Sequence, residues 1–310
     1  MSVREIVCED LIGAIEDLRR EGFRLDFIYP ADDPKSAELS RAGETVRIAR
    51  SDAPALPDGL PEFVPEYVLT RAGAAPAEGR AGMLYRDLLP SRLGGRYVAS
   101  HITIPYGGTV SDWVHYHRVA LQLIVVRRGW VRLVYEDQGD PFVMNEGDLV
   151  LQPPGIRHRV LESSPGLEVV EISAPALHAT YADHDLALPN GERRGRAFRR
   201  QHFLHHVAAA TGWTPFNGAE ARETMMAEAS AGLADVRTIR RGNASRMEFA
   251  PTDGELVFGF VLEGEAELDG SAIAPADAFA IPPRQAWAIG PMSSDFRLLH
   301  VTTERLDAAA

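Results

Sequence analysis

The pattern of hydrophobic and polar positions changes character along the chain. Residues 7–21 carry apolar side chains at helical spacing and are predicted to form a helix. The stretches 23–30 and 44–50 alternate between apolar and polar residues as strands do, and residues 32–43 between them resemble a short capped helix. A Pro-rich stretch follows, so we predict that residues 1–65 form a small N-terminal α/β arm that ends at this boundary.

Short runs typical of β-strands dominate the rest of the chain. From about residue 94, runs rich in Val, Ile, Leu and aromatic residues are separated by Gly, Pro, Asn or Asp, and the same texture returns over residues 236–302. Many short strands separated by turn residues are typical of an antiparallel sandwich or barrel. We therefore predict a mainly β protein with barrels over residues 66–180 and 235–310, joined by a partly helical connector over residues 181–234 that is rich in Ala and Glu.

Composition and charge narrow the class of protein. The 310 residues are 45% hydrophobic and 25% charged, and the formal net charge is 32 − 44 = −12. This acidic balance argues against a nucleic-acid partner, because such proteins present a basic face to phosphates. No apolar run reaches the roughly 18 residues of a membrane span, and the charged N-terminus does not resemble a signal peptide. We therefore expect a cytoplasmic protein with no membrane partner.

Three histidines form the strongest candidate site. His115 and His117 are separated by one residue, so both side chains point to the same face of a strand. Gly155 supplies a turn that delivers His158 to the start of a later strand. Three imidazoles that converge inside a small barrel form a site for a transition metal. We predict that these three histidines bind a metal and that Gln122 is a weak oxygen ligand or a partner of bound water or ligand. The alternative is that the histidines lie in polar loops or are satisfied by hydrogen bonds in the core.

The residues around these histidines resemble the paired signatures of the cupin superfamily. The first signature combines Gly, His-x-His, an acidic residue and Gly, and the second combines Gly, Pro-x-Gly and His. The matching residues here are Gly108, His115, His117, Gln122, Gly129, Gly147, Pro153, Gly155 and His158. Gln122 replaces the family's Glu ligand, and Glu162 stands where the family has an Asn. The resemblance covers about residues 94–175 and implies a double-stranded β-helix, or jelly-roll, barrel.

Residues 236–302 resemble a second cupin barrel that has no metal site. Alignment of the turn residues places Ala250 and Thr252 at the His-x-His positions. The same alignment places Val257 at the acidic position and Trp287 at the last histidine. None of these side chains is an ordinary metal ligand. The chain therefore resembles a bicupin with one metal-binding and one degenerate barrel, and this resemblance also implies a homodimer formed through barrel edges.

The uncharged ligand set suggests a class of reaction. Neutral imidazoles leave the full charge on a divalent metal, which attracts anionic, chelating substrates. The chain is similar to the cupin dioxygenases for gentisate, salicylate and β-diketones in using three histidines without an acidic ligand. This resemblance implies a non-haem Fe(II) dioxygenase that uses O₂ to cleave or oxidise a small anionic substrate, aromatic or enolisable. The alternatives are Zn, Ni, Mn or Cu as the metal, and a metal-dependent isomerase or lyase or a non-catalytic small-molecule-binding cupin as the function.

Strand parity predicts the surroundings of the metal. If Gln122 points inward, Ile124 and Val126 also point inward and form an apolar wall. Arg132 is a candidate partner for a substrate carboxylate, and His101 on the preceding strand is a weaker candidate for the cavity. The predicted pocket residues are Trp113, Tyr116, Ile124, Val126 and Arg132. Further histidines cluster near the connector, where surface or capping roles are expected: His178, His184, His202, His205 and His206.

Overall fold

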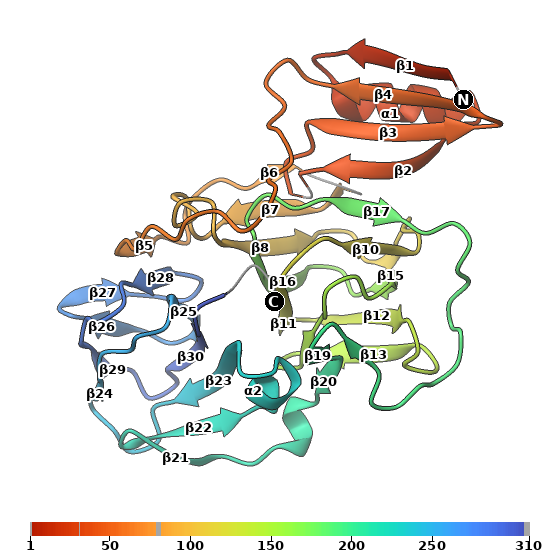
Figure 1. The fold of residues 1–310 in the computed structure, drawn as a ribbon. Helices are drawn as coiled ribbons and strands as arrows, with labels where there is room; N and C mark the ends of the chain where they lie inside the picture. The colour runs from red at the N-terminus through yellow and green to blue at the C-terminus, as the bar shows by residue number, and fades with distance from the viewer. Residues whose placement is uncertain (1, 31, 79–81, 307–310) are drawn as a thin grey trace.

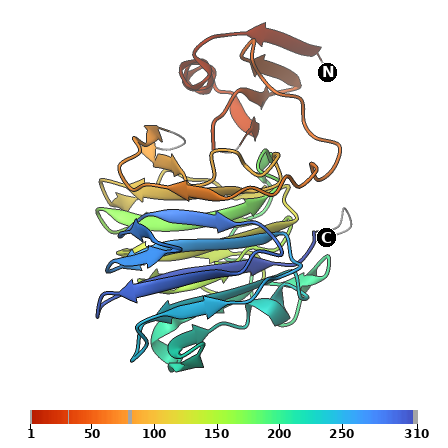
Figure 2. The same ribbon diagram turned by 90° about the vertical axis from the view of Figure 1, so that its left-hand side faces the viewer.

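The computed structural model describes residues 2–30, 32–78 and 82–306 and confirms a mainly β protein with two jelly-roll barrels and few helices. In Figure 1 the N-terminal arm lies at the top of the molecule, with the first barrel (yellow to green) and the second barrel (blue) beneath it. Figure 2, a quarter turn away, again shows the arm at one end, beyond both barrels. No helix in the described ranges is long and apolar enough to cross a membrane.

The N-terminal arm is a four-stranded sheet packed against one helix. Its elements are β1 (Ser2–Val7), α1 (Leu11–Arg20), β2 (Arg24–Tyr29), β3 (Ser36–Arg41) and β4 (Glu44–Ala49). Helix α1 begins after Asp10, whose carboxylate accepts a hydrogen bond from the Gly13 backbone N–H at 2.9 Å, as an N-cap residue does. The helix buries Leu11, Ile15 and Leu18 against the sheet, which gives the arm a core of its own.

The prediction of a short helix over residues 32–43 is wrong, because strand β3 occupies this segment. Ala37 and Leu39 alternate with polar residues and are both buried in the core of the arm. A spacing of two residues places both side chains on one face of a strand, whereas a helix would separate them. The apolar alternation therefore outweighs the capping signals that precede it.

The first barrel consists of two facing sheets. The sheet that carries all three candidate histidines contains β9 (Gly108–Thr109), β10 (His115–His117), β12 (Trp130–Tyr135), β13 (Phe142–Asn145), β15 (His158–Ser163) and β17 (Thr180–Ala182). The opposite sheet contains β6 (Ala77–Glu78), β7 (Leu84–Asp87), β8 (Val98–Ile104), β11 (Leu121–Arg128), β14 (Leu149–Leu151), β16 (Leu167–Ala174) and β20 (Leu204–His206). Strand β17 pairs with β10 on one side and with β2 on the other, so the arm continues the first of these sheets.

The second barrel repeats this plan. One of its sheets contains β5 (Val68–Thr70), β21 (Thr214–Phe216), β22 (Ala219–Glu223), β23 (Ala234–Arg240), β25 (Leu256–Glu263), β28 (Ala278–Ile281) and β30 (Arg297–Thr303). The other contains β24 (Met247–Phe249), β26 (Ala266–Leu268), β27 (Ser271–Ile273) and β29 (Trp287–Met292). Neighbouring strands in both of these sheets pair in the antiparallel direction, as expected for a jelly roll.

The segment between the barrels contains more strand than its composition suggests. Its helical parts are a 3₁₀ turn, η2 (Ala208–Ala210), and a single helical turn, α2 (Met226–Ala229). Besides β20, β21 and β22 it contains the hairpin of β18 (Ala197–Phe198) and β19 (Gln201–His202). In β22 the buried Ala219 and Ala221 alternate with polar residues, so the Ala- and Glu-rich sequence fits a half-buried strand.

The two barrels exchange strands and share a core. Strand β5 precedes the first barrel in the sequence but pairs with β28 of the second barrel, and β20 pairs with β14 of the first. One hydrophobic cluster includes Leu123 and Ile172 from the first barrel and Phe258 and Val301 from the second. Separation of the two barrels would expose this apolar cluster to water, which is unfavourable.

A buried ion pair also crosses the interface between the barrels. The Arg96 guanidinium donates from Nε and Nη2 to the two carboxylate oxygens of Glu255, at 2.9 and 2.7 Å. The Tyr97 hydroxyl donates to the same carboxylate at 3.0 Å, and all three residues are buried. The bidentate geometry and the additional Tyr97 donor offset the cost of removing the two charges from water.

Candidate metal centre

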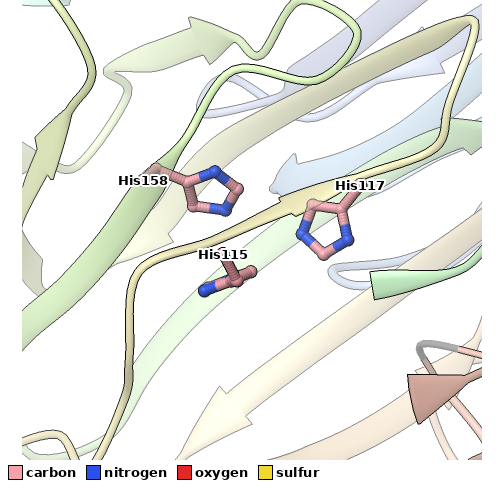
Figure 3. Close-up of side chains that lie close together, drawn as sticks. All are labelled: His115, His117 and His158. Atoms are coloured by element: carbon pink, nitrogen blue, oxygen red, sulfur yellow. The ribbon is translucent and has the colours of Figure 1, made fainter. Parts of the chain in front are cut away.

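The three candidate histidines meet at one point of the first barrel. His115 and His117 lie on β10, and His158 begins β15, which pairs with β10 so that His115 stands opposite His158. All three are buried, and they offer ligand atoms that lie within 4.8 Å of one another. Figure 3 shows the three imidazoles turned toward a common space. Gly155, with a φ of 76° in the turn before β15, provides the left-handed backbone that leads into His158.

Hydrogen bonds fix the orientation of each imidazole. His115 and His158 each donate from Nδ1 to the backbone carbonyl oxygen two residues earlier, at 2.8 and 3.2 Å. Nδ1 of His117 lies 2.9 Å from the Thr180 hydroxyl on β17. A carbonyl oxygen only accepts, so at His115 and His158 the proton sits on Nδ1 and Nε2 carries the lone pair. Histidines that bind a metal are held in this way, so the donor set fits a divalent metal ion.

A chain of directed hydrogen bonds passes beside this cluster. The Tyr135 hydroxyl donates to Gln152 Oε1, and Gln152 Nε2 donates to Gln122 Oε1 at 3.0 Å. Gln122 Nε2 then donates to a carboxylate oxygen of Glu171 at 2.9 Å, and the Ser173 hydroxyl donates to the same oxygen at 3.0 Å. Burial, together with the negative charge of Glu171, raises the pKa of Tyr135, so this residue is a neutral donor at neutral pH.

This series of hydrogen bonds determines which atom of Gln122 can interact with a bound water or ligand. A carboxylate accepts and does not donate, so the NH₂ group of Gln122 faces Glu171 and its Oε1 faces Gln152. An amide oxygen has two lone pairs, and Gln152 uses one of them. Gln122 lines the cavity, so its second lone pair remains a candidate acceptor for a bound water or ligand.

A cavity of about 110 Å³ lies next to the histidine cluster, between the two sheets of the first barrel. Most of its wall is apolar, including Ile102, Ile124, Leu133, Met144, Val160 and Val169. The polar end contains the three histidines, the hydrogen-bonded chain from Tyr135 to Glu171, and the side chains of Asp32, His178 and Thr180. None of the described lining residues is Lys or Arg.

Three of the residues predicted to line the pocket lie elsewhere. Tyr116 is the residue between His115 and His117, so it points to the opposite face of β10, where its ring stacks on Tyr181 at 5.3 Å. Trp113 packs against the hydrophobic core of the arm. Arg132 forms an ion pair with Glu162 at 3.4 Å on the outside of the barrel.

The strand-parity predictions for Ile124, Val126 and His101 have different outcomes. Ile124 lines the cavity. Val126 is buried in the hydrophobic cluster beside the cavity but is not one of the lining residues. His101 points away from the cavity, because on β8 it stands opposite Val170, which faces the second barrel. Its Nε2 lies 2.8 Å from Glu168, and its ring packs against Phe260 of the second barrel.

Glu171, Asp32 and His178 are among the polar cavity residues that were not predicted from the sequence. Glu171 shares its face of β16 with Leu167 and Val169, so a carboxylate within an alternating apolar strand was the signal that could have identified it. Asp32 comes from the arm, and His178 follows β16 by four residues. No local pattern marks these last two, because the pairing of β2 with β17 brings their segments together.

Aromatic rings fill the equivalent part of the second barrel. Phe249 stands opposite Trp287, as His115 stands opposite His158 in the first barrel. The sequence alignment that placed Ala250 at the first histidine position is therefore displaced by one residue. Among the described residues, His115, His117 and His158 are the only cluster of three or more potential metal ligands.

Comparison with known proteins supports this architecture. Residues 100–172 match the family model of the Cupin domain, and no curated protein matches the chain. Oxalate decarboxylase from Bacillus subtilis has a similar structure, 11% identical over 78% of this chain and 77% of that one, with a TM-score of 0.55. A Pseudomonas aeruginosa protein described as glyoxylate induced is 15% identical over 81% of this chain and 94% of that one, with a TM-score of 0.57. The chain therefore contains a cupin domain, and its fold is similar to that of the bicupin oxalate decarboxylase.

Proposed function

We propose that the first barrel is the catalytic barrel of a metal-dependent enzyme and that His115, His117 and His158 hold a divalent ion. The observation that carries this proposal is that all three rings use Nδ1 for a hydrogen bond and offer their ligand atoms within 4.8 Å of one another. Three buried neutral nitrogens suit iron(II), which is the proposed metal. Zinc, nickel, manganese or copper would use the same atoms.

The proposed reaction is oxidation or cleavage of a small aromatic or enolisable compound by O₂. With iron(II) in place, the site would supply open coordination positions at which substrate and O₂ react. The apolar wall around Ile124 and Val160 keeps water from the reacting compound. The hydrogen bonds that end at Glu171 hold the amide of Gln122 in one orientation at the edge of the cavity. Both contributions come from side chains fixed by packing, as catalytic positioning requires.

Oxygen consumption tests this proposal. Protein purified without O₂ and loaded with iron(II) would be mixed with a panel of phenolic acids, catechols and β-diketones in an oxygen electrode. We expect at least one compound to cause O₂ uptake, and we expect His158→Ala to abolish it. His202→Ala, which removes an exposed histidine outside the cavity, is the matched control. Zinc as the native metal, together with no uptake for any compound, would contradict the proposal.

A lyase or isomerase is the second candidate function. The observation that favours it is the structural likeness to a protein named oxalate decarboxylase, although a fold alone does not determine a reaction. Such an enzyme would turn over its substrate without consuming O₂. Product formation under strict anaerobiosis, lost in His158→Ala, would favour this function over oxidation.

A further inference from the structure

His178 is a buried histidine that uses one of its two ring nitrogens for a hydrogen bond within the described residues. It is 3% exposed, and its Nδ1 lies 3.1 Å from the carbonyl oxygen of Pro175. The carbonyl can only accept, so Nδ1 carries the proton and Nε2 carries a lone pair. Nε2 is buried without a hydrogen-bond partner among the described residues. Its ring lies 5.5 Å from that of His117, centroid to centroid, and lines the cavity.

Asp32 brings a second unsatisfied acceptor to the same cavity. Its Oδ2 accepts a hydrogen bond from Arg92 at 2.7 Å, whereas its Oδ1 is buried without a partner in the described part of the chain. Arg92 also donates to Asp87 at 3.3 Å, so two carboxylates share one guanidinium and this corner keeps a net negative charge. Buried acceptors without partners are rare in folded proteins, and a bound group commonly satisfies them.

The charge of the cavity lining also restricts the ligand. Asp32 and Glu171 each contribute one carboxylate, and no described lining residue is Lys or Arg. A divalent ion at the three histidines would be balanced by these two carboxylates. An additional anion would therefore bring unbalanced negative charge into an enclosed, largely apolar space, which is costly. A neutral ligand avoids this cost.

We propose that the cavity binds a small uncharged compound that carries a hydroxyl group, and that this hydroxyl donates a hydrogen bond to Nε2 of His178. This inference rests on the proposed metal site, and it replaces the anionic substrate expected from the sequence with a neutral one. The cavity measures about 110 Å³, which limits the ligand to a small compound. His178 acts here as a residue that selects the ligand, while the three-histidine cluster holds the metal.

Calorimetric binding to the zinc-loaded protein tests this assignment with three probes. Phenol carries one hydroxyl, toluene carries a methyl group in its place, and oxalate is a dianion. We expect the wild-type protein to bind phenol about ten- to a hundredfold more tightly than toluene, the range for a buried hydrogen bond that one partner cannot make. In His178→Ala this preference should fall close to one, and His178→Gln, which restores an acceptor, should recover part of it. His202→Ala should keep the full preference.

The possible outcomes separate this inference from the metal proposal. Zinc content, measured by elemental analysis, should be unchanged in both His178 variants, and thermal melts should show that they are folded. A wild-type protein that binds no zinc would contradict the metal site itself. A protein that binds zinc but prefers oxalate to phenol, or binds none of the probes, would overturn the neutral ligand. An unchanged preference in folded His178→Ala would overturn the role of His178.

Discussion

Phe249 stacks on Trp287 in the second barrel, with ring centroids 3.8 Å apart and an angle of 4° between the planes. This pair occupies the position at which His115 and His158 face each other in the first barrel. Phe279 meets the edge of Trp287, and Gly259 leaves room for the Phe279 ring, which a Cβ at that position would approach to 2.1 Å. One barrel thus encloses a cavity with histidines, and the other encloses packed rings.

Removing this packing should destabilise the second barrel. Trp287→Ala deletes a buried ring that contacts Phe249 and Phe279, and we expect it to lower the free energy of unfolding by about 3–5 kcal/mol. Trp213→Ala, at a partly exposed indole that lies under Arg240, should cost much less. Urea denaturation followed by circular dichroism measures both. Equal losses in the two variants would contradict the packing argument.

Loss of a histidine in the first barrel should remove the metal and leave the fold. His115→Ala and His158→Ala each delete one of three ligands, and we expect the metal content to fall at least tenfold. The hydrophobic cores of the arm and of both barrels do not depend on these side chains. Elemental analysis gives the metal content, and far-ultraviolet circular dichroism reports the fold. Global unfolding of both variants would show that the histidines are structural.

Loss of the Tyr135 hydroxyl, the first donor of the hydrogen-bonded chain beside the cavity, should destabilise the protein. Tyr135→Phe leaves Oε1 of the buried Gln152 without the hydroxyl that donates to it. An unsatisfied buried acceptor costs about 1–3 kcal/mol of folding free energy. Tyr106→Phe, at a tyrosine that is 88% exposed, is the control and should change stability little. Chemical denaturation distinguishes the two, and a neutral Tyr135→Phe would indicate that water replaces the hydroxyl.

Lowering the pH should destabilise the protein, because His300 in the second barrel is buried in its neutral form. Burial, aided by the charge of Arg237, lowers the pKa of His300 to about 4 from its ordinary value of 6.5. The unfolded chain therefore takes up a proton near pH 6.5, while the folded chain does so only near pH 4. The contribution of His300 to the free energy of unfolding is complete above pH 6.5. It is lost as the pH falls from 6.5 to 4, by a total of order 3 kcal/mol.

Thermal melts of metal-free protein between pH 7 and pH 4 measure this effect. His300→Phe removes the titrating group and should flatten the decline in melting temperature across this interval. His202→Ala, which removes an exposed histidine, should keep the wild-type slope. If His300→Phe declines as steeply as the wild type, another group controls the acid response.

Local patterns predicted the parts of the site that lie on regular strands. The spacing of His115 and His117, and the turn before His158, were sufficient because residue parity decides which way a side chain points once one inward residue is known. Ile124 followed from Gln122 by the same rule. The rule failed for His101 because nothing in the sequence identified an inward residue on its own strand.

The remaining residues depend on features that local patterns do not contain. Asp32 and His178 reach the cavity only because β2 pairs with β17, a contact between segments about 150 residues apart. The position of Phe249 was missed because Leu256, which begins β25, follows Phe249 by seven residues, whereas Leu121, which begins β11, follows His115 by six. Strand β3 was mistaken for a helix because its two buried side chains, Ala37 and Leu39, form too short an apolar pattern to compete with capping signals.

The exchange of β5 and β20 makes the two halves of this protein interdependent. A fragment that ends with β17 would lack β20 and expose the edge of β14, and it would carry β5 without β28 to pair with. Unpaired edges of this kind recruit other chains and lead to aggregation. The barrel filled with aromatic rings thus serves as a partner in folding for the barrel that carries the chemistry, and we expect both to unfold in a single cooperative transition.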